Sequence, residues 1–533
     1  MGAAQSHPET HRVSGKGTFV PALETFQAID LSVDQGAQPA PPEWLRTGFA
    51  AVQPQALALA APSFTDPSSM DFVLGNLLPA VSSGSSVTAA ASAQLTDDNS
   101  DIAVGGPTAR SEDDVTGTGV KIGILSDSFD LLGGMAADEA DGNLPADVQI
   151  LKEGSSGHDE GRAMADLVHQ IAPGASIAFY TATDSEADFA AGIAALQAAG
   201  CNIIVDDVAY LDEPFFQDGG VVQQAVENAV ADGVSYFTAA SNEGDDYVQQ
   251  SFTPMQLAPQ GLPGGVVVQN FGSASDPQPW VDVTVPQGGE VELDMQWDQP
   301  FASIGNSQGS TNSIGMALYN AAGQLVAATR TDDVGSNPVQ ILTYTNTTSS
   351  TDFRLVVFAN GGSSLPGTFK IINYGNGTIN NDAGTGSGTV IGHEMVADAN
   401  TVGAVAYSAT QAFGGSNTVQ SFSSQGTGEI LFNAQGQRLV APVTTDKVNF
   451  LAPDGSITSV FAPFYGTSAA APDAAAVAAL MLQADPSLTP GQVTSILEAT
   501  AAPATGSDLA IGAGLIQAPA AVALALQYAT SHI

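Results

Sequence analysis

Short apolar runs alternate with amphipathic stretches from residue 117 onward. The runs are apolar at consecutive positions, which is typical of strands buried on both faces. The predicted strands are residues 120–125, 176–180, 202–205 and 235–239. The intervening helical patterns cover residues 160–171, 186–199 and 221–232. Strands that alternate with helices of this length predict an α/β fold with a doubly wound parallel sheet.

The helical period disappears between residues 251 and 392. Short alternating segments follow one another there, separated by Gly, Asn, Ser and Pro, and this pattern favours an inserted antiparallel β-sandwich. The clearest predicted strands are residues 281–285, 290–295, 315–319 and 353–358. The α/β pattern resumes at residues 401–405, and a long Ala-rich helix follows Ser468.

Residues 1–95 are rich in Ala, Pro and Ser and keep no period, apart from a short helical pattern at 43–52. They are typical of a leader or a loosely packed prosegment. We therefore predict four segments. These are a prosegment at 1–95, the first part of the α/β domain at 96–250, an inserted sandwich at 251–392, and the second part at 393–533.

Composition narrows the classes of function. The chain has 533 residues, with 55 Asp plus Glu against 12 Lys plus Arg, and a formal net charge of −43. Nucleic acids and anionic membranes select for clustered cations, so neither is an expected partner. The chain is 44% apolar and only 13% charged, which indicates a folded protein rather than a disordered one. Its single cysteine, Cys201, allows no intramolecular disulfide and is expected to be buried.

Three candidate residues lie where a strand meets a helix or loop. Asp127 follows a buried strand, Glu160 opens a helix, and Ser468 opens another. Functional groups of a parallel sheet belong at the carboxyl ends of its strands. Free amides at a helix N-terminus favour the oxyanion that forms after attack by a serine. Gly-Thr-Ser before a helix is on its own more often a simple N-cap, so the three residues must be considered together.

Together with other motifs, these residues resemble the subtilase family of serine proteases. The resemblance implies that Ser468 is the nucleophile, Asp127 the acid and Asn242 the side-chain donor to the oxyanion. It covers residues 117–250 and 395–505, and the order acid, base, serine is that of subtilisins. The matching segments are residues 124–128 (ILSDS), 159–161 (DEG), 239–244 (AASNEG), 401–405 (TVGAV), 421–424 (SFSS), 466–472 (GTSAAAP) and 492–498 (QVTSILE).

The general base departs from the subtilisin pattern. Where subtilisins carry a histidine, this chain has Glu160, which resembles the sedolisins, acid-active relatives that use Ser, Glu and Asp. Sedolisins place their Asp four residues after the Glu, where this chain has Met164, and use Asp at the oxyanion site, where it has Asn242. The chain resembles a hybrid of the two patterns.

A carboxylate needs help to act as the base. The ordinary pKa of Glu, about 4.3, is too low for efficient deprotonation of serine, but two nearby carboxyls share a proton and raise one pKa. Asp127 or Asp207 could be the partner of Glu160. Asp206 and Asp207 would point in opposite directions if their strand continues, so at most one faces the site. Alternatively, both are solvated loop carboxylates.

Histidines and one arginine offer other interpretations. His158 precedes the Glu160 helix by two residues and could fold back as the base, or it is a solvated loop residue. His169 is half a turn out of phase with Glu160, and His393 is expected to be structural. Arg162 is expected to be a surface cation, with orientation of a carboxylate as the alternative.

The leading hypothesis is a serine endopeptidase that cleaves polypeptides through an acyl-enzyme on Ser468, with Glu160 as base and support from Asp127 or Asp207. A carboxylate base predicts an acidic optimum, on the order of pH 3 to 6. The alternative is an inactive subtilase-like binding or adhesion protein that displays the sandwich. Labelling by a serine-directed probe discriminates the two.

The sequence indicates the cofactors and the cellular location of the protein less directly than its activity. Many subtilases bind calcium through loop carboxylates, but no regular Asp-x-Asp-x-Asp-Gly loop occurs here, so calcium has no assigned residues and no metal ligand is predicted. The first residues lack the apolar core of a signal peptide, and no apolar run approaches the ~18 residues of a membrane span. The few lysines and the apolar carboxyl end at residues 524–528 favour a secreted bacterial protein exported by a carboxyl-terminal signal.

Overall fold

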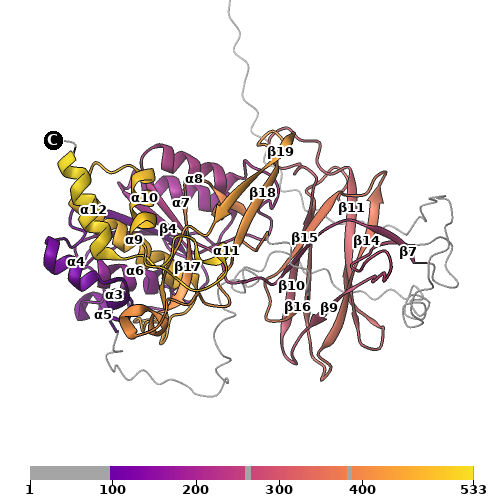
Figure 1. Cartoon of the computed structure of the whole chain (residues 1–533), viewed down its shortest axis with the longest axis horizontal. Coiled ribbons are helices and arrows are strands. Elements are labelled where there is room, and N and C mark those ends of the chain that lie inside the picture. Colours follow the sequence, from indigo (N-terminus) through magenta and orange to yellow (C-terminus); the bar gives the residue numbers. More distant parts are fainter. Residues whose placement is uncertain (1–96, 258–265, 381–386, 532–533) are drawn as a thin grey trace, which may run out of the picture.

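The computed structural model describes residues 97–257, 266–380 and 387–531. The predicted prosegment at 1–95 and its helical pattern at 43–52 lie outside the described residues. The described chain forms two lobes, one built of helices around a parallel sheet and one built of antiparallel strands (Figure 1).

A seven-stranded sheet forms the centre of the first lobe, and every neighbouring pair of its strands is parallel. The strands predicted from the apolar runs are all present, which confirms the parallel α/β prediction. In spatial order the strands are β2 (Gln149–Lys152), β3 (Ser176–Thr181), β1 (Lys121–Ser126), β4 (Ile203–Asp206), β5 (Ser235–Ala239), β17 (Asn400–Ala406) and β20 (Phe450–Asp454).

Helices cover both faces of this sheet. On one face lie α6 (Glu160–Ile171) and α9 (Thr467–Ala484), and on the other lie α7 (Glu186–Ala198) and α8 (Val221–Ala231). Side chains alternate between the faces, so Ile203 and Val205 join the α6–α9 core while Ile204 joins the α7–α8 core.

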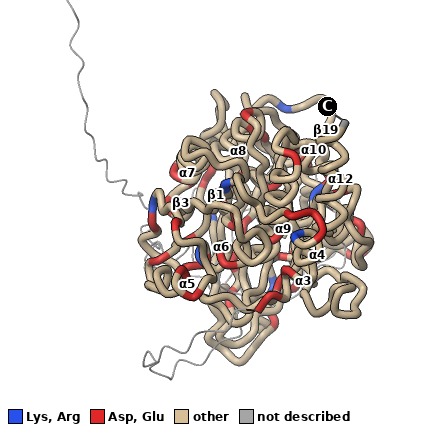
Figure 2. Tube along the Cα trace, turned by 90° about the vertical axis from the view of Figure 1, so that its left-hand side faces the viewer, with Lys and Arg blue, Asp and Glu red and all other residues tan. Residues whose placement is uncertain are grey.

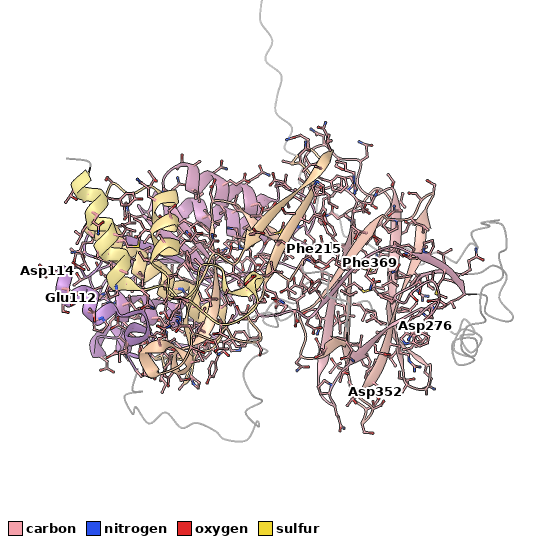
Figure 3. All side chains as sticks on the ribbon, in the orientation of Figure 1. Glu112, Asp114, Phe215, Asp276, Asp352 and Phe369 are labelled. Carbon is pink, nitrogen blue, oxygen red and sulfur yellow. The ribbon has the colours of Figure 1, made fainter. Side chains whose placement is uncertain are left out.

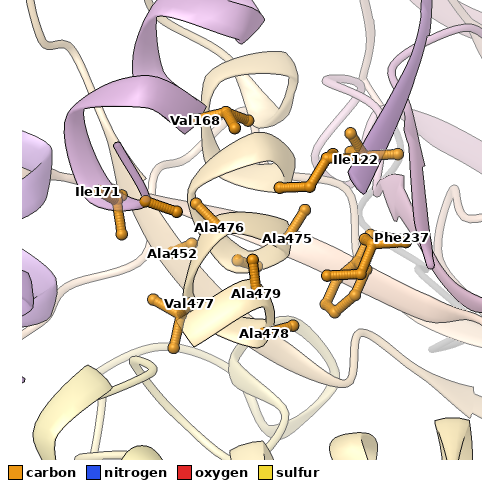
Figure 4. Packing of buried hydrophobic residues seen from close by; sticks show 14 of the residues in the cluster. Ile122, Val168, Ile171, Phe237, Ala452, Ala475, Ala476, Val477, Ala478 and Ala479 are labelled. Carbon is orange, nitrogen blue, oxygen red and sulfur yellow. The ribbon is translucent and has the colours of Figure 1, made fainter. Parts of the chain in front are cut away.

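Alanine lets α9 lie close to the sheet. Figure 4 shows the alanines of α9 packed between Val168 of α6, Ile122 of β1 and Phe237 of β5. Because alanine side chains are short, the helix axis can approach its neighbours closely, and every residue from Thr467 to Leu482 is buried. Ser468, in the first turn, is thereby fixed relative to the sheet.

The described residues of the second lobe, 247–257 and 266–380, form two antiparallel sheets. Their facing side chains, including Leu293, Met316, Leu355 and Phe369, join one hydrophobic cluster. The first strand of these two sheets begins at Tyr247, slightly before the predicted boundary at 251, and their last described strand ends at Asn380.

One sheet contains β13 (Val339–Thr345), β10 (Glu290–Trp297), β15 (Thr368–Asn373) and β6 (Tyr247–Ser251). The other contains β12 (Leu325–Thr329), β11 (Asn312–Asn320), β14 (Asp352–Gly362), β8 (Val266–Gln269) and β7 (Pro254–Leu257), with β9 (Val281–Thr284) and β16 (Thr378–Asn380) attached.

Several short or exposed elements have no counterpart in the sequence predictions. In the first lobe they are the sheet strands β2 and β20, and also α3 (Asn99–Val104), α4 (Gly106–Asp113), α5 (Met135–Asp141), the hairpin of β18 (Gly426–Phe432) and β19 (Arg438–Lys447), α10 (Pro490–Thr500), α11 (Asp508–Ile511) and α12 (Ala518–Ser531). The 3-10 turns are η2 (Gly392–Met395), η3 (Tyr407–Ala409) and η4 (Gln411–Phe413). The apolar carboxyl end forms α12, which packs on α4 and α9.

Acidic residues are spread over the first lobe without a cluster of basic ones, as Figure 2 shows. Among the helices in the described ranges, none has the length and apolarity needed to cross a membrane. Cys201 is buried as predicted, and burial raises the pKa of its thiol to about 11.

Candidate active site

Four of the predicted site residues meet at the carboxyl edge of the parallel sheet. Asp127 directly follows β1 and Asp207 follows β4, while Glu160 and Ser468 stand in the first turns of α6 and α9. All four are nearly buried, with exposed fractions of 1% for Asp127, 6% for Asp207, 5% for Glu160 and 3% for Ser468. Parallel strands with helices on both faces bring these distant segments together.

Asp127 binds backbone amides. Its Oδ1 accepts from the amides of Ser128 and Glu160, the latter at 2.9 Å, and its Oδ2 accepts from the amide of His158 at 2.6 Å. Burial raises the pKa of Asp127, and these amide hydrogen bonds oppose the rise. Asp127 therefore fixes the start of α6, and its charge acts on Glu160 from there.

Arg162 is not the surface cation that was expected. It is buried, and its guanidinium pairs with Asp138 and, at 3.0 Å, with Asp159, while Nε donates to the Phe129 carbonyl at 2.9 Å. A buried cation needs such partners, and these come from separate segments of the chain. The alternative interpretation holds instead, because Arg162 orients the carboxylate of Asp159.

Asp159 adopts a backbone conformation that is uncommon for residues with a side chain. Its φ is +59°, in the left-handed region, directly before Glu160. Its amide donates to Ser128 Oγ at 2.8 Å, and its carboxylate accepts from Ser128 Oγ at 3.1 Å. These contacts hold the turn that aims Glu160 toward the site.

The carboxyl group of Glu160 faces the hydroxyl of Ser468 and the carboxyl of Asp207. Burial, followed by the charges of Asp207 and Asp127, raises the pKa of Glu160 well above its usual range, and the Ser468 hydroxyl opposes that rise. Burial and the charge of Asp127 likewise raise the pKa of Asp207. Two buried carboxyl groups that face each other favour one shared proton over two negative charges, so Glu160 and Asp207 are expected to form an acid–carboxylate pair.

Asp206 points away from this pair. Its Oδ1 accepts from Thr238 Oγ1 at 2.9 Å and lies 3.2 Å from His393 Nε2 on the α7–α8 face. His393 is buried between Asp206 and Glu213, whose Oε1 lies 2.8 Å from Nδ1. Burial lowers the pKa of His393, but the charges of Glu213 and Asp206 outweigh burial and raise it well above its usual range. His393 is structural, as predicted.

Asn242 lies beside the turn that precedes α9. Its Oδ1 accepts from the backbone amide of Thr467 at 3.0 Å and from Thr467 Oγ1 at 3.1 Å. Nδ2 is thereby left as a donor, and neither Nδ2 nor the Ser468 amide has a hydrogen-bond partner within the described ranges. Two unused N–H donors beside a serine hydroxyl are the arrangement that an oxyanion requires.

The turn around Asn242 is itself held on both sides. Ser241 has φ +68°, and its hydroxyl donates to the buried Glu394. The Glu243 amide donates to Ser424 Oγ at 3.1 Å, and that hydroxyl donates to Glu243 Oε2. Glu394 and Ser424 were not predicted as site residues, because their link to Asn242 arises only from folding.

Neither candidate histidine reaches Ser468. His158 is exposed, and its backbone amide, not its ring, hydrogen-bonds with Asp127. His169 lies in the last turn of α6, where burial lowers its pKa. Among the described residues, neither imidazole ring hydrogen-bonds with Ser468 or Glu160.

Asp454 is a further residue that the sequence predictions missed. It ends β20 at the same sheet edge, is fully buried, and accepts the Gly466 amide at 3.1 Å. The feature of the sequence that could have identified Asp454 is its position at the end of a buried apolar strand. Within residues 97–257, 266–380 and 387–531, no group of three or more His, Cys, Asp or Glu side chains is arranged to hold a metal ion.

Comparison with known protein families gives one match. Residues 295–514 match the model of the subtilase family. The subtilase match includes Ser468 and covers less than half of the chain, so the other four site residues lie outside it. The match supports the assignment of this protein as a serine endopeptidase. No curated protein sequence matches the chain.

Solved structures resemble the whole fold at low identity. The CspB protease of Clostridium perfringens is 14% identical with a TM-score of 0.53, over 81% of this chain and 99% of that one. A lanthipeptide protease is 13% identical with a TM-score of 0.39, over 80% of this chain and 94% of that one. At such identity the likeness to the CspB protease shows a shared fold.

Proposed function

We propose that the protein is a serine endopeptidase in which Ser468, Glu160 and Asp207 form the catalytic triad. One observation carries the proposal: the buried carboxyl of Glu160 lies between the hydroxyl of Ser468 and the carboxyl of Asp207 and interacts with both. A nucleophile in contact with a base, and a base in contact with a third group that orients it, is the arrangement that covalent catalysis by serine requires.

In the first half-reaction, Ser468 Oγ attacks the peptide carbonyl carbon and its proton passes to Glu160. The C–N bond then breaks as Glu160 returns this proton to the departing amine, which leaves an acyl ester on Ser468. In the second half-reaction, Glu160 takes a proton from water, the hydroxide attacks the ester, and the proton returns to Ser468 Oγ. Asp207 holds Glu160 in place throughout by their shared proton.

The negative oxygen formed in each step has two donors in this proposal. They are Asn242 Nδ2, whose orientation follows from the Thr467 contacts with Oδ1, and the backbone amide of Ser468. The positive end of the α9 dipole lies at the same place and adds to their effect. Asp127 contributes by fixing the Glu160 backbone and by its charge.

The proposed active form is the Glu160–Asp207 pair with a single proton. Loss of activity at low pH reflects protonation of both carboxyls, and loss at high pH reflects removal of the shared proton. The profile is expected to be bell-shaped with an acidic maximum, on the order of pH 3 to 6. His158 has no part in it.

The remaining segments complete the proposal. Residues 251–392 are an inserted β-sandwich domain between the two parts of the catalytic domain, 96–250 and 393–533, and residues 1–95 are a prosegment. The protein acts on polypeptides and is secreted by a bacterium without a conventional signal peptide. The antiparallel sheets with their shared core and the low count of basic residues support these assignments.

The alternative, an inactive scaffold that displays the sandwich, is not favoured. A scaffold without catalysis has no use for a buried carboxyl pair against a serine hydroxyl, since buried carboxyls cost stability. Nor does it need two unpaired N–H donors beside that hydroxyl.

Hydrolysis of denatured casein across the pH range tests the proposal, together with fluorophosphonate labelling. We expect an acidic maximum and labelling that Ser468→Ala abolishes. An optimum above about pH 8 would remove Glu160 as the base. Cleavage that survives Ser468→Ala would remove the whole assignment.

A further inference from the structure

Three consecutive backbone amides lead into α9, and each has a different environment. The Gly466 amide donates to Asp454 Oδ2 at 3.1 Å, and the Thr467 amide donates to Asn242 Oδ1 at 3.0 Å. The Ser468 amide has no acceptor in the part of the chain that the structure describes. Two side chains therefore hold the turn, and the third amide is left for a ligand.

We propose that Asp454 is a positioning residue that holds this turn and thereby aims the hydroxyl and amide of Ser468. The inference rests on the proposed function of Ser468. Asp454 acts through Gly466 and does not contact the reacting atoms itself. Gly466 has φ +109°, which residues with a side chain rarely adopt, so the turn depends on outside contacts to keep its shape.

Asp454 is itself rigidly placed. It pairs with Ala406 in the parallel sheet, and its side chain is fully buried. Gln420 Nε2 donates to Oδ1 at 3.0 Å and also lies 3.3 Å from Oδ2. A carboxyl group fixed by a strand on one side and an amide on the other can hold a turn to the precision that catalysis needs.

Asparagine is a close substitute for Asp454 at acidic pH. Burial raises the pKa of Asp454 to about 6, against the hydrogen bonds from Gln420 and Gly466, so the carboxyl is neutral where the enzyme is expected to work. An asparagine oxygen can accept the Gly466 amide, and the Gln420 side chain can turn its oxygen toward the new NH2 group. Alanine removes both contacts.

Asp166 provides a matched control. Like Asp454 it is fully buried and accepts one backbone amide and one side-chain amide, from Ser459 at 2.7 Å and Gln170 at 2.8 Å. Its backbone contact is Ser459, which lies in the loop between β20 and α9 but seven residues before Gly466, and Asp166 makes no hydrogen bond with Gly466, Thr467 or Ser468 among the described residues. Asp166→Ala therefore reproduces the cost of removing a buried carboxyl from this loop while the contacts of residues 466–468 with Asp454 and Asn242 stay in place.

The experiment compares Asp454→Ala, Asp454→Asn and Asp166→Ala with the unaltered full chain. The readouts are the fluorophosphonate labelling rate, kcat and KM on a peptide, and hydrogen exchange of the segment 466–470. We expect Asp454→Ala to lower kcat and labelling on the order of 10- to 100-fold with little change in KM. Asp454→Asn should restore both rates, and Asp166→Ala should leave them unchanged. Exchange in 466–470 should rise only in Asp454→Ala.

Two results would overturn the inference: labelling of Asp454→Ala at the unaltered rate, or an equal loss in Asp166→Ala. If the unaltered protein is not labelled at any pH, the proposed function fails, and hydrogen exchange decides the inference separately. Faster exchange of 466–470 in Asp454→Ala alone would still support the role of Asp454 in holding the turn. Unchanged exchange would refute it.

Discussion

Asp206 and Asp207 are consecutive residues whose carboxyl groups lie on opposite faces of the parallel sheet. Asp206 binds Thr238 and His393 on the α7–α8 face, whereas the carboxyl of Asp207 faces Glu160 on the α6–α9 face. The cationic ring of His393 balances the charge of Asp206, whereas no cation among the described residues does so for Asp207. The uncompensated carboxyl is the one that can share a proton with Glu160.

Asp207→Asn should remove the alkaline limb of the pH profile and leave the acidic limb nearly in place. The charge of Asp207 raises the pKa of Glu160 only once the shared proton has left, and asparagine has no such proton to lose. The acidic limb reports addition of a second proton to a pair in which Asp207 is already neutral, so a neutral asparagine changes it little. The measurement is kcat/KM on one peptide against pH. An alkaline limb that persists in Asp207→Asn would contradict the pairing of Glu160 with Asp207.

Glu160→Gln should abolish most activity at every pH. Glutamine keeps the shape and can still hydrogen-bond with Ser468, but it cannot accept the hydroxyl proton, and loss of a general base costs on the order of 10²- to 10⁴-fold in kcat. Fluorophosphonate labelling should fall in parallel. A matched change, His158→Gln, should leave both rates unchanged, and a large loss there would restore the histidine hypothesis.

Asn242→Ala should lower kcat by about 10²- to 10³-fold with a small change in KM, because an oxyanion donor acts in the transition state. The variant also removes the acceptor of the Thr467 amide, so thermal unfolding must be recorded alongside. Asn242→Asp separates the two effects, since it keeps an acceptor for Thr467 and loses the donor. If Asn242→Asp retains full activity at neutral pH, Asn242 is not an oxyanion donor.

Local pattern was enough to predict the layered α/β core. The apolar runs identified five of the seven strands of the parallel sheet, all but β2 and β20, and helix α6 begins and ends where its amphipathic pattern does, at Glu160 and Ile171. The period of two along a strand also predicted that Asp206 and Asp207 would diverge. These features depend on neighbours in the sequence, which is why they could be predicted without contacts.

Contacts between distant segments could not be predicted in this way. Arg162 has the sequence context of a surface residue, and its burial depends on Asp138 and Asp159 meeting it in the fold. Asp454 and Gly466 come together because β20 ends beside α9. The exposed strand β19 lacks an alternating pattern, so its hairpin with β18 was missed.

The protein should be more stable at pH 4 than at pH 8. Burial raises the pKa of several carboxyls, among them Asp166 and Glu243 to about 7 and Glu394 to about 8. A carboxyl with a raised folded-state pKa contributes stability that is complete below its unfolded pKa, near 4, and is lost as pH rises through the folded value. Urea unfolding of Ser468→Ala at the two pH values measures the difference.

Asp166→Asn isolates one such contribution. With a pKa of about 7, Asp166 should account for on the order of 3 kcal/mol of the difference between pH 4 and pH 8. The free energy of unfolding of Asp166→Asn should change less between pH 4 and pH 8, by a difference of about this size. The asparagine side chain should keep the contacts with Ser459 and Gln170. An unchanged pH slope would show that Asp166 is ionised in the folded protein at pH 4.

Lys370 should change the pH dependence of stability in the opposite direction to the buried carboxyls, because it destabilises the protein at low pH. It is a buried lysine on β15, and its Nζ lies 5.9 and 5.4 Å from the ring centroids of Phe215 and Tyr247. Figure 3 labels Phe215 and also Phe369, which directly precedes Lys370 in the chain. Burial lowers its pKa to about 7, and the charge of Glu429 only partly opposes that effect. Below pH 7 the folded protein therefore carries a poorly solvated ammonium group.

Replacing Lys370 by methionine should stabilise the protein, and more so at pH 5 than at pH 9. At pH 5 the ammonium is charged in both states and its full burial cost is removed, on the order of 1 to 4 kcal/mol. At pH 9 the folded-state amine is already neutral, so less is gained. Urea unfolding in the Ser468→Ala background measures both values. Greater destabilisation of Lys370→Met at pH 5 than at pH 9 would instead mean that the two rings and Glu429 solvate the ammonium well, which would contradict the lowered pKa.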